Sequence, residues 1–121
     1  MTTWRLYPQG IQNVLTTVIG QQETLGTALT EDKFTAIFDG VQCGGMFTAV
    51  VPNALSQLMT DQQDNLTTVV NRINAGVLGV GNATMAYNNG QQDMAAEFQS
   101  QMGNAASGDF SFFEQHGYQG E

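Results

Sequence analysis

The sequence predicts an all-α protein built as an antiparallel helical hairpin. Between residues 55 and 102, apolar side chains recur at alternating steps of three and four, which gives one narrow stripe along a long helix. A shorter stretch with helical spacing precedes it over residues 11–38, and glycines separate the two. Because such a stripe is shielded from water only by another helix, we expect helix pairing before any chemistry.

The first helix is predicted to start near Pro8, since proline is well tolerated in the first turn of a helix. Thr30 is a good N-cap, and Glu31 and Asp32 follow it as acids that favour the positive end of a helix dipole. We therefore expect a kink or a short second segment there.

Glycines at 40, 44 and 45 predict the hairpin tip at residues 40–45. Pro52 fixes either the start of the second helix or a kink in its first turns, so that helix is expected from about residue 52 onward. Asn88-Asn89-Gly90 is a strong turn signal and predicts a break at 88–90, although the apolar spacing continues through it.

We expect the stripe of the second helix to pack against the first helix up to Tyr87, facing Val14, Val18, Leu25 and Leu29, with part of its surface left for a partner. Glycines at 76, 79 and 81 would allow a facing helix to approach closely. Beyond the predicted break no helix of the chain remains to cover the stripe, so its last residues are expected to contact another protein. The predicted interface residues are Leu55, Met59, Leu66, Val69, Ile73, Val77, Val80, Met94, Phe98 and Met102.

Two regions follow: a hairpin domain over residues 1–102 and a tail over 103–121. From Gly103 the sequence Gly-Asn-Ala-Ala-Ser-Gly predicts a flexible linker. The aromatic residues that follow indicate docking onto this bundle or onto another protein, with disorder as the alternative. They are Phe110, Phe112, Phe113 and Tyr118.

Composition argues against several classes of function. The net charge of −8 disfavours nucleic acids and anionic membrane surfaces, and no stretch approaches the roughly 20 apolar residues that span a bilayer. With the single Cys43 and the single His116, an internal disulfide is excluded and a zinc site has too few ligands. No nucleophile and base stand at a recognisable catalytic spacing, so we expect no metal, no cofactor and no enzymatic activity.

Two short elements carry a resemblance to a known family. They are Trp4-Arg-Leu-Tyr-Pro8-Gln-Gly10 and Ala86-Tyr87-Asn-Asn-Gly90-Gln-Gln-Asp93-Met94-Ala95. With the acidic helical hairpin, they make residues 3 to 102 resemble the WXG or ESAT-like superfamily, the small actinobacterial proteins associated with type VII secretion. The tryptophan departs from the family pattern, which places a Trp-x-Gly at the hairpin tip.

The resemblance implies a hairpin that dimerises into a four-helix bundle. It also implies a protein that is cytoplasmic before export and leaves the cell folded, without a cleaved leader, often escorting a larger effector. The export signal of the family is Tyr-x-x-x-Asp/Glu after the second helix. Here Tyr87 with the displaced Asp93 comes nearest to it.

The leading hypothesis is a non-enzymatic adaptor of a type VII-like secretion system that works by helix pairing. Its partner would be another small helical protein, the helical N-terminal domain of an effector, or a second copy of the chain. The alternative is a self-assembling structural subunit, such as a filament or phage component.

Overall fold

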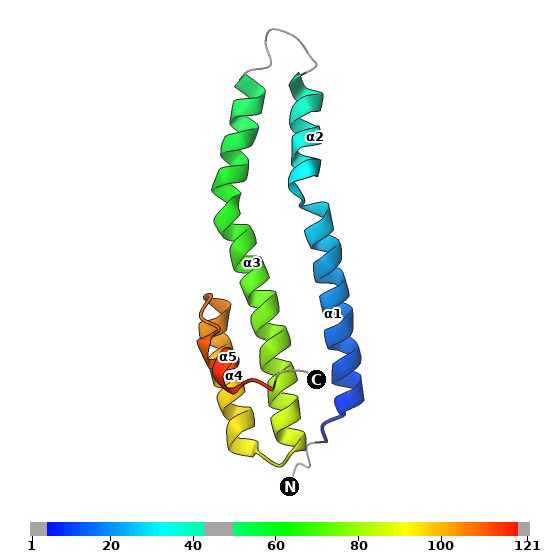
Figure 1. Cartoon of the computed structure of the whole chain (residues 1–121), viewed down its shortest axis with the longest axis vertical. Helices are drawn as coiled ribbons and strands as arrows, with labels where there is room; N and C mark the ends of the chain where they lie inside the picture. The colour runs from blue at the N-terminus through cyan, green and yellow to red at the C-terminus, as the bar shows by residue number, and fades with distance from the viewer. Residues whose placement is uncertain (1–4, 43–49, 119–121) are drawn as a thin grey trace.

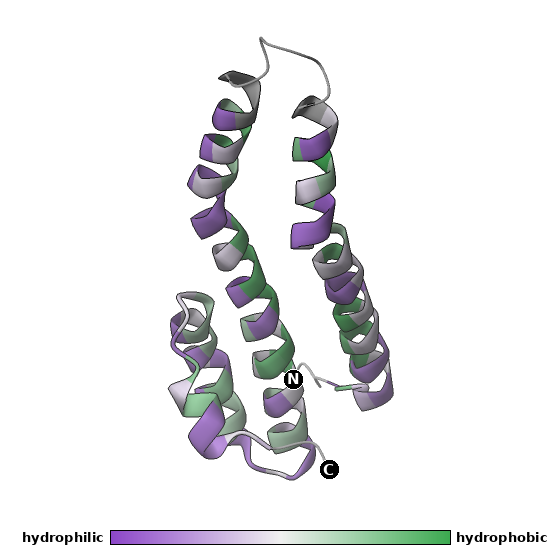
Figure 2. Ribbon diagram, turned by 45° about the horizontal axis from the view of Figure 1, so that its top comes forward, coloured by the Kyte–Doolittle hydropathy of each residue, from purple (hydrophilic) through white to green (hydrophobic). Residues whose placement is uncertain are grey.

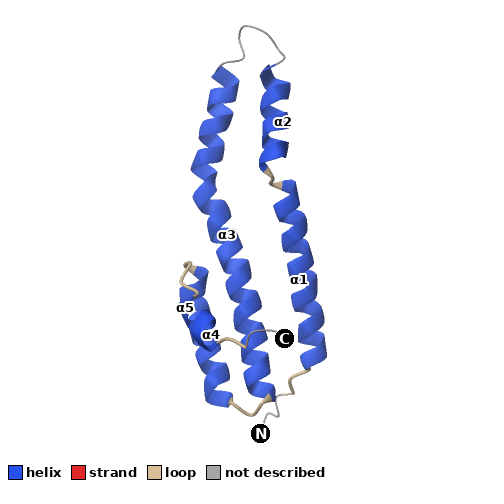
Figure 3. Ribbon diagram, in the orientation of Figure 1, coloured by secondary structure: helices blue, strands red, loops and turns tan. Residues whose placement is uncertain are grey.

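The computed structural model describes residues 5–42 and 50–118, and every regular element within these ranges is a helix (Figure 3). The all-α class predicted from the sequence is therefore confirmed. The helices are α1 (Pro8–Ala28), α2 (Glu31–Gln42), α3 (Val50–Asn88), α4 (Gln92–Ala106) and α5 (Ser111–His116).

Helices α1 and α2 follow one another along one side of α3, which runs in the opposite direction (Figure 1). The break between them lies at Leu29 and Thr30, where the carbonyl of Thr30 accepts hydrogen bonds from the N–H groups of Lys33 and Phe34. Glu31 and Asp32 occupy the first turn of α2, where the helix dipole favours negative charge. Residues 43–45 of the predicted tip lie outside the described residues, and Gly40 lies within α2.

The chain reverses between α3 and α4 at Gly90, which has a φ of 76°. The N–H of Gly90 donates to the carbonyl of Tyr87, and the N–H of Gln91 donates to the carbonyl of Ala86. This is the Schellman pattern of helix termination, which needs a left-handed residue and so favours glycine. The turn lies where the Asn-Asn-Gly sequence signal indicated a break.

The core lies between α3 and α4, rather than between α3 and α1. Small side chains predominate in this core, so the backbones of α3 and α4 approach closely. Helix α5 covers part of the core. In contrast, α1 contributes no buried residue. The stripe residues Ile73 and Val77 lie beside Val14 of α1, as expected, but that contact buries no residue of α1. The buried apolar residues are Ala75, Ala83, Ala86, Ala95, Phe98, Ala105 and Phe113.

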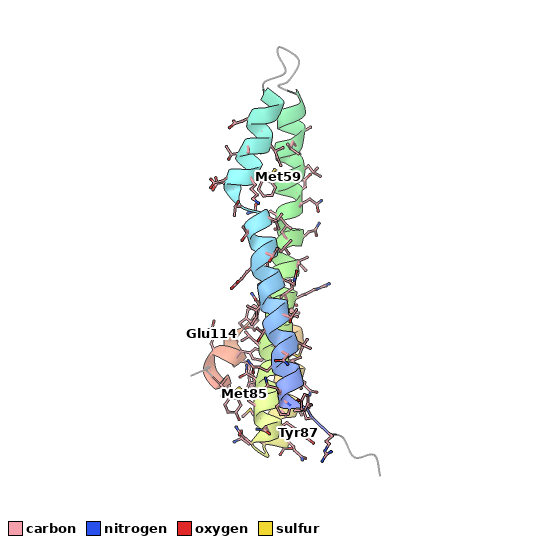
Figure 4. The ribbon with its side chains drawn as sticks, turned by 90° about the vertical axis from the view of Figure 1, so that its right-hand side faces the viewer. Met59, Met85, Tyr87 and Glu114 are labelled. Atoms are coloured by element: carbon pink, nitrogen blue, oxygen red, sulfur yellow. The ribbon has the colours of Figure 1, made fainter. Side chains whose placement is uncertain are left out.

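The segment predicted as a flexible linker is partly helical, because α4 continues to Ala106. The chain then turns through Gly108, with a φ of 102°, and α5 folds back onto α4. Ring centroids of Phe112 and Phe113 lie 5.6 and 5.7 Å from that of Phe98. The aromatic segment thus docks onto its own chain, and Figure 4 shows α5, marked by Glu114, standing to one side of α1 and α3.

None of the described helices combines the length and the apolar character that crossing a membrane requires.

Candidate docking face

A groove of about 450 Å³ runs between α1 and α3 and has an almost wholly apolar lining. Arg72 is the one charged residue among those that line it. The apolar residues are side chains of the two stripes, at spacings of three and four on each helix. From α1 they are Ile11, Val14, Leu15 and Val18, and from α3 they are Ile73, Val77 and Val80, with Gly10 and Gly76 between them.

This groove is open because two helices side by side leave two faces, and the chain covers only one of them. On the covered side, α5 and Tyr118 line a second groove of about 660 Å³, together with Ile19 and Leu78. On the other side Val14 is 61% exposed, and Val80 is also exposed. Such a contiguous apolar surface is typical of a binding site for another protein.

The apolar surface continues beyond this groove at both ends. Toward α2 lies a groove of about 530 Å³, whose apolar lining includes Phe34, Phe38 and Met59. Toward the α3–α4 turn lies one of about 400 Å³, where Leu6 and Tyr87 take part. We call the groove between α1 and α3 with these two extensions the docking face. Hydrophobic residues follow both helices along this length (Figure 2).

The predicted interface residues fall into three groups in the structure. Leu55, Met59, Ile73 and Val77 are half-buried, whereas Leu66, Val69 and Val80 are exposed. Among the α4 residues, Met94 is exposed and Met102 is half-buried against the core. Phe98 is fully buried, so it is not available to another protein in this arrangement. The expectation that no helix of the chain covers it was wrong, because α3, α5 and Tyr118 enclose it.

Asn82 is a structural residue that the sequence did not single out. It is the buried polar side chain in the described part of the chain, with 5% of its surface exposed. Its amide N–H donates to the carbonyl of Leu78 at 2.8 Å, and its Oδ1 accepts from the N–H of Tyr118 at 2.6 Å. An isolated Asn between Gly81 and Ala83 carries no sequence signal for such a contact, because the partner lies 36 positions away.

The glycine run of α3 serves more than one contact. A Cβ at Gly79 would overlap the side chain of Met102, so this glycine brings α4 close to α3. A Cβ at Gly81 would lie 3.5 Å from Leu15 of α1, an ordinary contact, while nothing lies within 4 Å at Gly76. The close approach predicted from this run therefore occurs at Gly79 with α4, rather than with the first helix.

The structure of residues 5–42 and 50–118 offers no evident metal site. Within these ranges, no cluster of three or more His, Cys, Asp or Glu is placed to hold a metal ion. Tyr87 and Asp93 both lie on the surface, the first at the end of α3 and the second in the first turn of α4. At Asp109, hydrogen bonds from the hydroxyl and the N–H of Ser111 lower the pKa of the carboxyl from its usual 3.8.

Comparison with known proteins places the chain in one family. The model of DUF6507, described as a family of unknown function, matches residues 1–111, and the chain belongs to this family. No curated protein and no solved structure matches the sequence. The matched segment includes α1 to α4 and the whole docking face, and it ends at the first residue of α5.

Proposed function

We propose that this DUF6507 protein is a non-enzymatic adaptor that binds an amphipathic helix, or a pair of helices, of another protein along its docking face. The observation that carries the proposal is the exposure of the apolar residues of α1 and α3 on the side opposite α5. Between Leu58 and Tyr87 these residues extend along α3 for about 43 Å at the usual helical rise. A partner helix fits such a length and spacing, whereas a small molecule would cover only part of it.

The docking face also favours a helical bundle as the structure of the complex with the partner. As a helical hairpin, α1, α2 and α3 leave one side uncovered, and a second two-helix element laid on that side would complete a four-helix bundle. The occupant that we propose is the hairpin of another small helical protein or the helical N-terminal domain of an effector.

A link to type VII secretion is proposed from the resemblance to WXG or ESAT-like proteins. Part of the element that carries this resemblance has a structural role, since Ala86 and Ala95 are buried and Gly90 forms the turn. Tyr87 and Asp93 of the same element are exposed on the surface of the chain. We propose that they act as a relaxed export signal, so that the chain leaves the cell folded.

Co-expression with each small helical protein or helical effector domain that neighbouring genes encode tests the adaptor proposal, and a protein that co-purifies serves as the partner. Val14→Asp and Leu66→Asp each place a carboxylate on the exposed docking face, and burying it under a partner without a counter-charge is costly. Both variants should lose co-purification. Thr16→Asp adds the same charge at an exposed position of α1 outside the groove and should retain it. Co-purification that survives both docking-face changes would overturn the proposal.

Light scattering on the isolated protein separates the adaptor from the self-assembling structural subunit. A mass of one or two chains supports the adaptor, whereas large homopolymers would favour the subunit.

Export of a Tyr87→Ala variant tests the secretion signal independently. Tyr87 also contributes to the end of the docking face, so co-purification with the partner serves as the control for this variant. We expect export to fall while co-purification persists. Undiminished export would remove Tyr87 from the proposed signal.

A further inference from the structure

The docking face contrasts in charge with the chain as a whole. The sequence holds eleven Asp and Glu residues against three Lys and Arg residues. None of the acids in the described part of the chain lines any of the three grooves that make up the docking face. On the covered side, in contrast, Glu114 is among the residues that line the groove. A partner laid on the docking face therefore meets no negative charge from its described lining.

Arg72 is the one charged residue, among those described, that lines the docking face. It is exposed, and no acid stands three or four positions from it on α3, where a helix places the partner of a salt bridge. Those positions hold Thr68, Val69, Ala75 and Gly76. The planar guanidinium can donate two parallel hydrogen bonds to a carboxylate. Neither the described lining of the docking face nor the adjacent turns of α3 supply that carboxylate, so a partner can.

Arg72 also lies near the middle of the docking face. Along α3 it stands 14 positions after Leu58 and 15 positions before Tyr87, which belong to the two extensions of the face. A helix that covers the whole face therefore passes Arg72 close to its own midpoint, whichever way it runs. An acid at that level can pair with the guanidinium. An apolar side chain there would remove water from the charge without replacing it, which is costly.

A second copy of this chain is a poor occupant of the docking face. If two copies paired through this face, the facing side chains would come from the same lining residues, which include no carboxylate among those described. In an antiparallel pair with the two faces in full overlap, Arg72 of one copy would lie opposite Arg72 of the other, because it stands near the midpoint. Like charges at that place oppose the pairing.

We propose that Arg72 selects the occupant of the docking face by charge. The occupant is a helix of another protein that carries an Asp or Glu near the middle of its apolar stripe, and this carboxylate pairs with the guanidinium of Arg72. A second copy lacks such an acid and is disfavoured. The inference rests on the proposed function, and it adds the chemistry by which the docking face distinguishes its partner from itself.

An Arg72→Glu copy of the chain can serve as the acid-bearing probe. Mixed with the wild-type protein, it places a carboxylate opposite Arg72, whereas each protein alone places like charges opposite one another. Sedimentation velocity measures the association. We expect the mixed dimer to form with a dissociation constant at least about tenfold lower than that of either protein alone, and to weaken as salt is added. Lys33→Glu is the matched control, because Lys33 is an exposed cation of α2 that lines none of the three grooves.

Two further comparisons separate this proposal from the proposed function. Val14→Asp, introduced into both chains of the mixture, should abolish the mixed dimer, and a dimer that persists would show that the charges pair away from the docking face. Equal association of wild-type protein with Arg72→Glu and with Lys33→Glu would overturn the selection by Arg72. With the co-purifying partner, Arg72→Glu should bind about tenfold more weakly than Lys33→Glu. Equal affinities of these two, with binding lost in Val14→Asp, would leave the docking face intact and overturn the selection alone.

Discussion

The backbone N–H of Tyr118 donates to the buried amide oxygen of Asn82, at a distance of 2.6 Å and across 36 positions of the chain. This bond anchors Tyr118, just after α5, to the last third of α3. Tyr118 also lies over Phe98, with ring centroids 6.0 Å apart. One face of the helical layer is thereby closed by the chain itself, which leaves the docking face as the open one.

Replacing Asn82 with Ala should destabilise the protein by about 1–3 kcal/mol, because the N–H of Tyr118 loses its acceptor in a half-buried position. Urea denaturation measures this change. Asn65→Ala is the control, since its side chain is exposed and bonds only to the neighbouring Gln62, and its effect should stay within about 0.5 kcal/mol. Equal stability of the two variants would show that Asn82 does not anchor the C-terminal segment.

Phe98→Ala should cost about 3–5 kcal/mol of unfolding free energy, because the ring is fully buried among aromatic side chains and its removal leaves a cavity. Met94→Ala, one turn earlier on the same helix, removes a side chain that is 36% exposed and should cost much less. Thermal unfolding of both variants checks the difference. A similar loss for the two would argue that Phe98 is not enclosed by α5.

Two glycines one turn apart on α3 should respond to alanine in opposite directions. Gly79→Ala forces Met102 to shift and should destabilise by about 1–3 kcal/mol. Gly76→Ala meets open space and should stabilise by up to about 1 kcal/mol, because alanine is the better helix former. Chemical denaturation of the pair is the measurement. Stabilisation by both substitutions would contradict the close contact of α3 and α4 at Gly79.

The start of α5 should depend on the charge of Asp109. Its native pKa is lowered by hydrogen bonds from Ser111 that the unfolded chain lacks, so the carboxylate stabilises the native state above the unfolded pKa of about 3.8. That contribution is lost as the pH falls through the lower native pKa. We expect the amide resonance of Ser111 in an NMR titration to move with a midpoint below 3.8. In Asp109→Asn this transition should be absent, and a midpoint above 3.8 in the wild type would contradict the assignment.

Local features of the fold could be read from the sequence because each has a local cause. Pro8 indicates a helix start because its missing N–H costs nothing in the first turn. The acids after Thr30 indicate another start because the helix dipole favours negative charge there. The Asn-Asn-Gly signal reflects the need for a left-handed residue, and Gly90 has that conformation. The stripe residues Val69 and Val80 were singled out by their spacing, and the structure places them on an exposed apolar surface.

Contacts between distant segments could not be read in the same way. Spacing identifies an apolar side of α3 but does not say which helix covers it, and the close packing with α4 depends on small residues such as Ala75 and Ala86. Because alanine side chains are small, these residues contribute little to a hydrophobic pattern in the sequence. The burial of Phe98 depends on α5, a helix of six residues that is too short to show periodicity.

Calorimetric titration of the co-expressed partner into Val14→Asp and Thr16→Asp tests the central claim most directly. The two variants carry the same added charge on the same helix, and they differ in whether it lies on the docking face. We predict that Val14→Asp binds the partner at least about 100-fold more weakly than Thr16→Asp, because the new carboxylate would be buried without a counter-charge. Equal affinities for the two variants would contradict the docking face.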